Sequence, residues 1–364
     1  MPPHANRRNF LALSAAGVAA GSATGTAANA HAGGWSAESR ATDRDVTAAD
    51  RPTAQQEHQL RLWYPDAARE WLEALPIGNG RLGAMVFGGV DAERLQLNED
   101  TVWAGGPYDP ANPDGLANLE EIRNRVFRED WSGAQSLIDS SFMGSPLGEL
   151  AYQTVGDLVL TFPSGGAASD YRRELDLTTA VALTRFTRDG VTYTRETFAS
   201  AADQVIAVHL TASAAGRISF TAAFESPQTT NAHSPDPLTI GLDGLSADME
   251  GIDGQVRFRA LAAAHATGGS VTSQDGTLIV NGADAVTLLV SIGTNYTSYQ
   301  DLTGDQNGRA LDPLTAVEGR SYDELRSRHV ADYQQYFGRT ALDVGSTDAA
   351  ELPTDQRVAG FAGG

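Results

Sequence analysis

Two stretches, near residues 80 and 100, contain the residue types that could do chemistry. Residues 78–83 have the spacing G-x-G-x-x-G, and Glu99 and Asp100 follow where a dinucleotide fold places its ribose-binding acid. In such a fold a buried strand enters the turn, and a helix leaves it with its N-terminus against the pyrophosphate. Here residues 69–76 do not resemble a buried strand, and residues 84–87 reach a Gly-Gly pair too soon for a helix. The spacing therefore does not predict a nucleotide site.

The same stretches are suited to binding a sugar. Asn79 and Arg81 stand between the glycines of a tight turn, which would direct both side chains outward. An amide, two acids and an indole follow within a few residues, and such groups match sugar hydroxyls and sugar ring faces. These are Asn98, Glu99, Asp100 and Trp103. Two simpler interpretations stay open, namely a β-turn with a surface salt bridge and a strand that ends in a capped turn.

Composition excludes several kinds of site. The chain has 364 residues and a net charge of −20, which argues against nucleic acid or an anionic membrane as a partner. All 26 basic residues are Arg, so neither a Schiff-base lysine nor a P-loop lysine exists. There is no Cys, and the seven His residues form no zinc motif. We therefore expect no cofactor and no metal.

The first residues resemble an export address. Arg7 and Arg8 precede Phe10 and Leu11, as in a twin-arginine signal, and a weakly apolar run follows. A small-residue cleavage pattern at 28–30 predicts a signal peptide over residues 1–30 and an exported protein without a membrane anchor. The alternative is a basic tail. The polar composition of residues 31–57 predicts a flexible linker.

Most of the remaining chain has the alternation of β-strands. The clearest hairpin joins residues 182–188 to residues 191–196 through Asp189-Gly190, a pair that favours a type I′ turn. The pattern lacks strand-helix-strand alternation, and it predicts a mainly β protein built as an antiparallel sandwich or barrel. The further strand-like runs are 204–210, 217–224, 255–261, 276–280 and 285–292.

Helices are few. Residues 115–130 and 131–142 have helical apolar spacing, and a third helix begins at Ser321, with Glu324 completing a capping box. A short strand at 340–344 and a loop containing Pro353 are expected after it.

Several blocks in one order resemble the N-terminal domain of glycoside hydrolase family 95, whose known members are mostly α-L-fucosidases. The resemblance covers roughly residues 58–364. Its blocks are 62–65, 70–83, 97–107, 152–158 and 329–339.

This resemblance implies a large antiparallel β-sandwich over residues 58–318 and a helical linker over 319–364. An (α/α)6 barrel would follow, with a Glu as general acid and an Asp-polarised Asn that positions water for inverting hydrolysis of fucosylated glycans. The sequence ends where that barrel is expected to begin, so we assign no catalytic residue and expect this chain alone to be inactive. The sugar-suited residues above would line either the substrate cleft or the seam with the barrel.

Two other functions stay open. One is a carbohydrate-binding sandwich without enzymatic activity. The other is a related glycosidase or phosphorylase that acts on another sugar, such as an L-galactoside.

Overall fold

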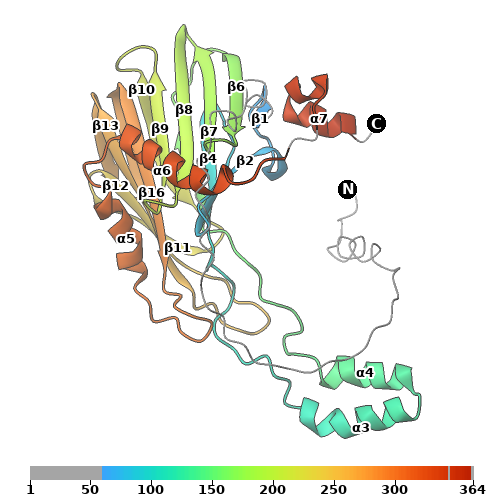
Figure 1. Ribbon diagram of the computed structural model, residues 1–364. Helices are drawn as coiled ribbons and strands as arrows, with labels where there is room; N and C mark the ends of the chain where they lie inside the picture. Colours follow the sequence, from blue (N-terminus) through green and yellow to red (C-terminus); the bar gives the residue numbers. More distant parts are fainter. Residues whose placement is uncertain (1–59, 343–344, 362–364) are drawn as a thin grey trace, which may run out of the picture. The chain divides into compact units, whose positions relative to one another are not determined.

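The computed structural model describes residues 60–342 and 345–361, so the expected export signal and the expected linker lie outside the described residues. Two antiparallel sheets are the main feature of the described chain (Figure 1). The larger sheet has nine strands, in the order β1 (Arg61–Tyr64), β6 (Ser169–Asp176), β7 (Val181–Arg188), β8 (Val191–Ser200), β9 (Val205–Ala212), β16 (Ala285–Thr294), β13 (Arg257–Thr267), β12 (Thr239–Leu245) and β11 (Thr229–Asp236).

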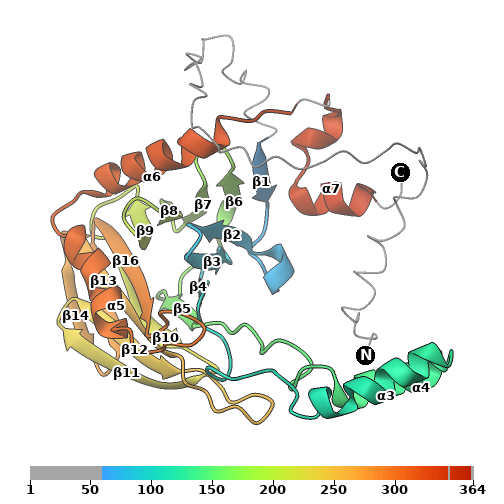
Figure 2. The ribbon, with the colours of Figure 1, turned by 60° about the horizontal axis from the view of Figure 1, so that its bottom comes forward.

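The smaller sheet has seven strands and faces the larger one (Figure 2). Its order is β14 (Ser270–Gln274), β15 (Thr277–Ala283), β10 (Ile218–Glu225), β5 (Gly156–Thr161), β4 (Ala92–Glu99), β3 (Leu82–Val86) and β2 (Leu75–Gly78). Pro76 lies in β2, an edge strand, where the missing N–H does not interrupt the ladder. The antiparallel β-sandwich expected from the sequence is confirmed.

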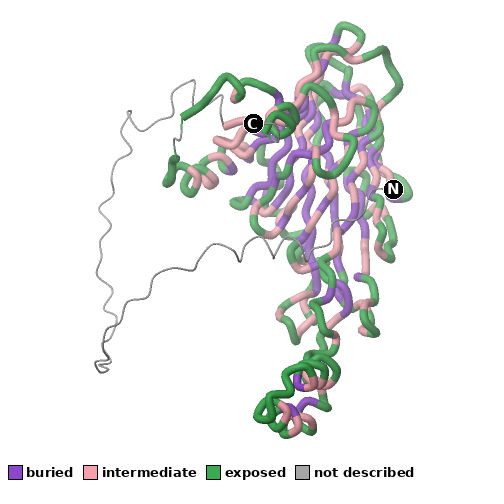
Figure 3. The backbone as a smooth tube through the Cα atoms, turned by 90° about the vertical axis from the view of Figure 1, so that its right-hand side faces the viewer, coloured by how far each residue is buried: buried purple, intermediate pink, exposed green. Residues whose placement is uncertain are grey.

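The middle of the nine-stranded sheet, around β8, β9 and β16, is apolar on both faces. Ile206, Val208 and Leu210 of β9 point into the core between the sheets, while Val205 and Ala207 belong to a second cluster on the opposite face. Burial on both faces explains why β9 reads as a nearly continuous apolar run. Figure 3 shows this burial along the strands.

Two helices cover that second face, α5 (Gln306–Ala316) and α6 (Tyr322–Phe337). Gly293 of β16 lets α5 approach closely, because a Cβ at Gly293 would lie 2.6 Å from the backbone nitrogen of Ala310. Ser321 and Glu324 form the expected capping box at the start of α6.

The structure describes five further helical elements. α3 (Gly115–Phe127) and α4 (Trp131–Ser141) follow β4 and precede β5 in the sequence, and the two helices pack against each other. Two 3-10 helices, η2 (Trp71–Glu73) and η3 (Asp348–Glu351), and the helix α7 (Thr354–Phe361) complete the described elements. α7 caps the open side of β1, where Thr354 Oγ1 accepts a 3.0 Å hydrogen bond from the N–H of Trp63.

The Asp-Gly hairpin and the five further strands expected from the sequence are confirmed. Asp189 and Gly190 have φ values of 51° and 74°, as a type I′ turn requires. The strand expected at 340–344 is wrong for residues 340–342, which form no strand. A strand needs a neighbouring edge to pair with, and α7 already contacts the open side of β1.

Candidate functional site

The turn between β2 and β3 is held in place by Asn79. Its Oδ1 accepts hydrogen bonds from the backbone N–H groups of Arg81 (3.1 Å) and Leu82 (2.7 Å). Its Nδ2 donates to the carbonyl oxygen of Ser200, 2.9 Å away at the end of β8. Gly80 has a φ of 94°, which a side chain would oppose. The glycine-rich stretch is therefore a β-hairpin turn fixed to the opposite sheet, and the rejection of a dinucleotide turn is confirmed.

Arg81 extends from this turn across the sandwich. Its Nε donates to Gln204 Oε1 at 2.8 Å and its Nη1 to the carbonyl oxygen of Ile292 at 2.5 Å. The same Nη1 lies 3.6 Å from Glu99 Oε1. Its guanidinium thus joins the β2–β3 turn to the β8–β9 turn and to β16.

Glu99 is a buried carboxyl with internal partners. The residue is 3% exposed, and its Oε2 accepts hydrogen bonds from Thr101 N (2.7 Å) and Thr101 Oγ1 (2.6 Å). Burial raises the pKa of Glu99, and the hydrogen bonds from Thr101 oppose that shift. Thr101 Oγ1 also lies 2.5 Å from Thr294 Oγ1, so the carboxyl is tied to the nine-stranded sheet as well.

Asn98 lies on the other face of β4. Along this strand Leu97 and Glu99 are buried, while Asn98 is half-buried on the opposite side. Successive residues of a strand point to opposite faces, so Asn98 does not join Glu99 in one cluster. The sequence alone could not show that Asn98 and Glu99 point to opposite sides, because that depends on residues 98 and 99 lying in a strand.

An exposed aromatic pair stands beside Asp100. Trp103 and Tyr152 are 40% and 44% exposed, and their rings meet edge to face with centroids 5.4 Å apart. Trp103 Nε1 donates to the carbonyl oxygen of Asp100 at 3.0 Å, and the Tyr152 hydroxyl donates to that of Glu99 at 3.1 Å. Burial and the nearby carboxylates raise the pKa of Tyr152 to about 12, so its hydroxyl stays protonated.

We call Arg81, Glu99, Asp100, Trp103 and Tyr152 the Trp103 patch. Tyr152 was not among the site residues expected from the sequence, because it joins the patch through an isolated bridge between two loops. Only its place in a family-like block could have drawn attention to it. The solvent-facing part of the patch is an indole, a phenol and the exposed carboxylate of Asp100. Such a surface can stack on a sugar ring and accept hydrogen bonds from its hydroxyls.

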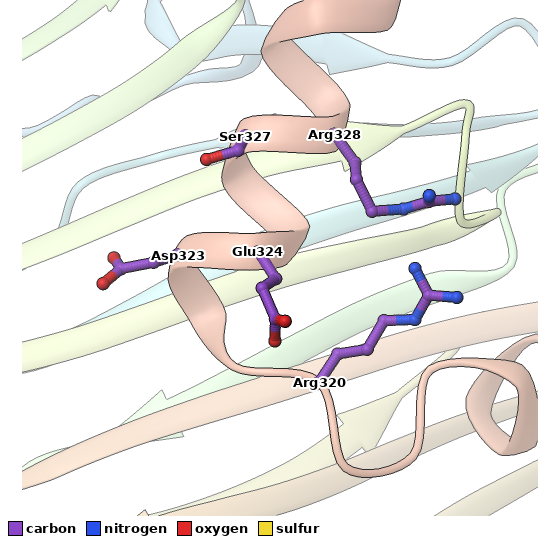
Figure 4. A pocket seen from close by; sticks show the side chains of 5 residues that line it. All are labelled: Arg320, Asp323, Glu324, Ser327 and Arg328. Carbon is purple, nitrogen blue, oxygen red and sulfur yellow. The ribbon is translucent and has the colours of Figure 1, made fainter.

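A polar hollow adjoins the patch through the β8–β9 turn. Asp203, next to Gln204, accepts a 2.9 Å hydrogen bond from Arg328 Nε and lies 3.5 Å from Arg320 Nη1. The open hollow has a volume of about 420 Å³, and Figure 4 shows both guanidinium groups beside it. Arg81, which bonds to Gln204, is thereby connected to the start of α6. The residues lining the hollow are Arg320, Asp323, Glu324, Ser327 and Arg328.

Within the described ranges, no three His, Asp or Glu side chains form a group that could hold a metal ion. None of the helices that the structure describes is long and apolar enough to cross a membrane.

Comparison with known proteins identifies the family. The model described as glycosyl hydrolase family 65, N-terminal domain, matches residues 62–299, which is most of the chain. The chain belongs to this family. The model of the glycosyl hydrolase family 95 catalytic domain matches residues 321–364, and this second match confirms the resemblance to family 95.

Fucosidases are among the relatives. Alpha-L-fucosidase 2 of Arabidopsis thaliana is 34% identical over 83% of this chain and 39% of its own length. Probable alpha-fucosidase A of Aspergillus niger is 27% identical over 79% of this chain and 38% of its own length. The chain thus spans about two fifths of the length of these curated relatives. A putative kojibiose phosphorylase structure is 10% identical over 77% of this chain and 38% of its own, with a TM-score of 0.44.

Proposed function

We propose that this chain is the N-terminal part of an exported glycoside hydrolase that releases L-fucose from glycans with inversion. The observation that carries the proposal is the 34% identity to an α-L-fucosidase over 83% of this chain. In this proposal residues 58–318 are the sandwich domain and residues 319–364 the linker to an (α/α)6 catalytic barrel. That barrel supplies the acid and the water-positioning residues, so this chain alone does not hydrolyse glycosides.

The Trp103 patch is the sandwich's contribution to the cleft or to the seam with the barrel. Arg81 and Glu99 have partners inside the sandwich, and their role is to hold the turn and the strand end that present the patch. Trp103, Tyr152 and Asp100 are the groups free to contact a glycan. No residue of this chain is given a catalytic role.

Export by the twin-arginine route is part of the proposal. It rests on Arg7, Arg8, Phe10 and Leu11 in the sequence. Changing Arg7 and Arg8 together to Lys should retain the protein in the cytoplasm, because this route recognises the arginine pair. Export that continues unchanged would remove this part of the proposal.

Hydrolysis is tested on two polypeptides. The 364-residue chain and a longer polypeptide containing a complete family 95 catalytic domain would each be incubated with 4-nitrophenyl α-L-fucoside and the corresponding α-L-galactoside. We expect release only by the longer polypeptide, faster from the fucoside, with β-L-fucose as the first product seen by NMR. Faster cleavage of the galactoside would change the sugar assignment. No cleavage by either polypeptide, together with glycan binding by the short chain, would favour a carbohydrate-binding sandwich.

A further inference from the structure

A second pocket lies at the opposite end of the sandwich from the Trp103 patch. It has a volume of about 280 Å³ and is lined by residues 162–165, by the β7–β8 hairpin and by the start of β10. Strand β8 contributes Tyr193 to this pocket, whereas Ser200, at its other end, bonds to Asn79. Seven residues of a β-strand extend about 23 Å. The pocket is therefore separate from the candidate site.

The lining offers aromatic surface and an unused hydroxyl. Phe162, Phe186 and Tyr193 all line the pocket, and the rings of Phe186 and Tyr193 stack with centroids 5.4 Å apart. The guanidinium of Arg195 lies 5.0 Å from the ring centroid of Phe162. Within the described residues the Tyr193 hydroxyl makes no hydrogen bond. An apolar ring face next to a free phenol matches the two kinds of surface of a pyranose.

The charge of the lining is the opposite of that of the whole chain. Arg188, Arg195 and Arg217 line the pocket with Asp189 as the one carboxylate among the lining residues, in a chain of net charge −20. Two of these arginines are paired, since Arg188 Nη2 lies 2.7 Å from a carboxylate oxygen of Asp91 and Arg195 Nη1 lies 2.5 Å from Glu93 Oε2.

The third arginine is available to a ligand. Arg217 is exposed at the rim, and its side chain has no hydrogen bond or ion pair in the described part of the chain. A guanidinium binds a carboxylate more strongly than it binds a hydroxyl. The free charge therefore favours a sugar that carries an acid group.

We propose that this pocket binds a uronic-acid residue of a glycan, with the sugar ring against the aromatic lining and its carboxylate on Arg217. The site would hold an acidic polysaccharide at a distance from the cleft. This inference concerns binding by the sandwich alone and does not depend on whether the longer polypeptide hydrolyses fucosides.

The test uses two sugars that differ only at C6. Methyl α-D-galacturonate and methyl α-D-galactoside would be titrated into the 364-residue chain, with binding followed by saturation-transfer NMR and by the Kd. We expect the galacturonate to bind more tightly and its affinity to fall as salt is added, because the charge contact is screened. Arg217→Ala should weaken galacturonate binding roughly tenfold.

Arg123→Ala is the matched control, because Arg123 is also exposed and its side chain has no hydrogen bond or ion pair within the described residues, but it lies on α3. Tyr193→Phe, which keeps the ring and removes the hydroxyl, should weaken both sugars. The proposal fails if neither sugar binds. It also fails if the two bind equally or if Arg217→Ala and Arg123→Ala have the same effect. Arg217 is at the surface, so loss of folding would not obscure the result.

Discussion

Arg81 Nη1 donates a 2.5 Å hydrogen bond to the carbonyl oxygen of Ile292, and this contact joins the β2–β3 turn of one sheet to strand β16, near its end, in the other. With the bond from Arg81 Nε to Gln204, it positions the β2–β3 turn beside Glu99. At this end of the sandwich, polar contacts therefore hold the two sheets together, whereas in the interior they are held together by apolar packing.

We expect Arg81→Ala to lower the free energy of unfolding by about 2–4 kcal/mol. The substitution leaves the carbonyl oxygen of Ile292 and the side chain of Gln204 without a donor, and an unpaired buried polar group is costly. Arg81→Lys should recover only part of this loss, because an ammonium cannot reproduce the planar fork of donors. Urea unfolding measures the effect, with Arg123→Ala as the exposed control. If Arg81→Ala matches that control, the contact has no role in stability.

Gly293→Ala should separate α5 from the sheet. A Cβ at Gly293 would meet the backbone nitrogen of Ala310 at 2.6 Å, and backbone cannot move aside as a flexible side chain can. Overpacking of this kind costs about 1–3 kcal/mol. Gly148→Ala is the matched control, since a Cβ at Gly148 meets nothing within 4 Å. Urea unfolding of both variants should show a loss for Gly293→Ala alone, and equal losses would contradict the proposed contact.

We expect the half-buried His209 and the buried His329 to make the docking of α6 sensitive to pH. His209 stacks on Tyr322 of α6 with ring centroids 3.8 Å apart, and His329 of α6 stacks on Phe198 at 4.5 Å. Burial lowers the pKa of both histidines from the ordinary value of 6.5. As pH falls below about 6.5 the unfolded chain takes up protons before the folded one does. The contribution of these two histidines to the free energy of unfolding is therefore fully present above that pH and is lost on acidification.

The charged groups around these histidines offset only part of the lowering of the pKa that burial causes. Glu196 on β8 and Asp323 on α6 raise the pKa of His209, while Arg326 lowers and Asp332 raises that of His329. His329 Nε2 also lies 2.9 Å from the carbonyl oxygen of Thr179, a contact that requires a proton on Nε2.

Thermal unfolding between pH 7.5 and 5 provides the measurement. The loss of Tm on acidification should be smaller in His209→Gln and His329→Gln than in the parent, while His265→Gln, at an exposed position on β13, should behave as the parent does. The comparison with the parent is necessary because Glu93 and Glu99 have raised pKa values and act in the opposite direction, favouring the folded state as pH falls. Parallel curves for all variants would show that neither histidine is involved.

Local signals predicted much of the fold. The Asp189-Gly190 turn fixed a hairpin because only a few residues accept positive φ, and the Ser321 capping box located the start of α6. Strand β12, with its two glycines, and helix α5, with Pro313 inside it, were missed because tertiary packing overrides their weak propensities.

The candidate site was less predictable, since it depends on which faces and loops meet. Asn98 and Glu99 are adjacent in sequence but lie on opposite faces of β4. Tyr152 and Trp103 are far apart in sequence and meet through an isolated bridge. Arg81 finds its partners in the β8–β9 turn and in β16, and these partners could be known only once the order of the strands in the sheets was known.

Trp103→Ala distinguishes a cleft from a seam. If the Trp103 patch contacts substrate, the change should raise KM of the longer polypeptide for a fucosylated oligosaccharide about fivefold to tenfold, because a sugar ring loses its aromatic partner. If the patch is a seam with the barrel, KM should stay close to that of the parent and the Tm of the longer polypeptide should fall instead. Trp131→Ala is the control, because Trp131 on α4 is 63% exposed and outside the patch. A KM and a Tm both equal to those of this control would show that the exposed indole of Trp103 serves neither purpose.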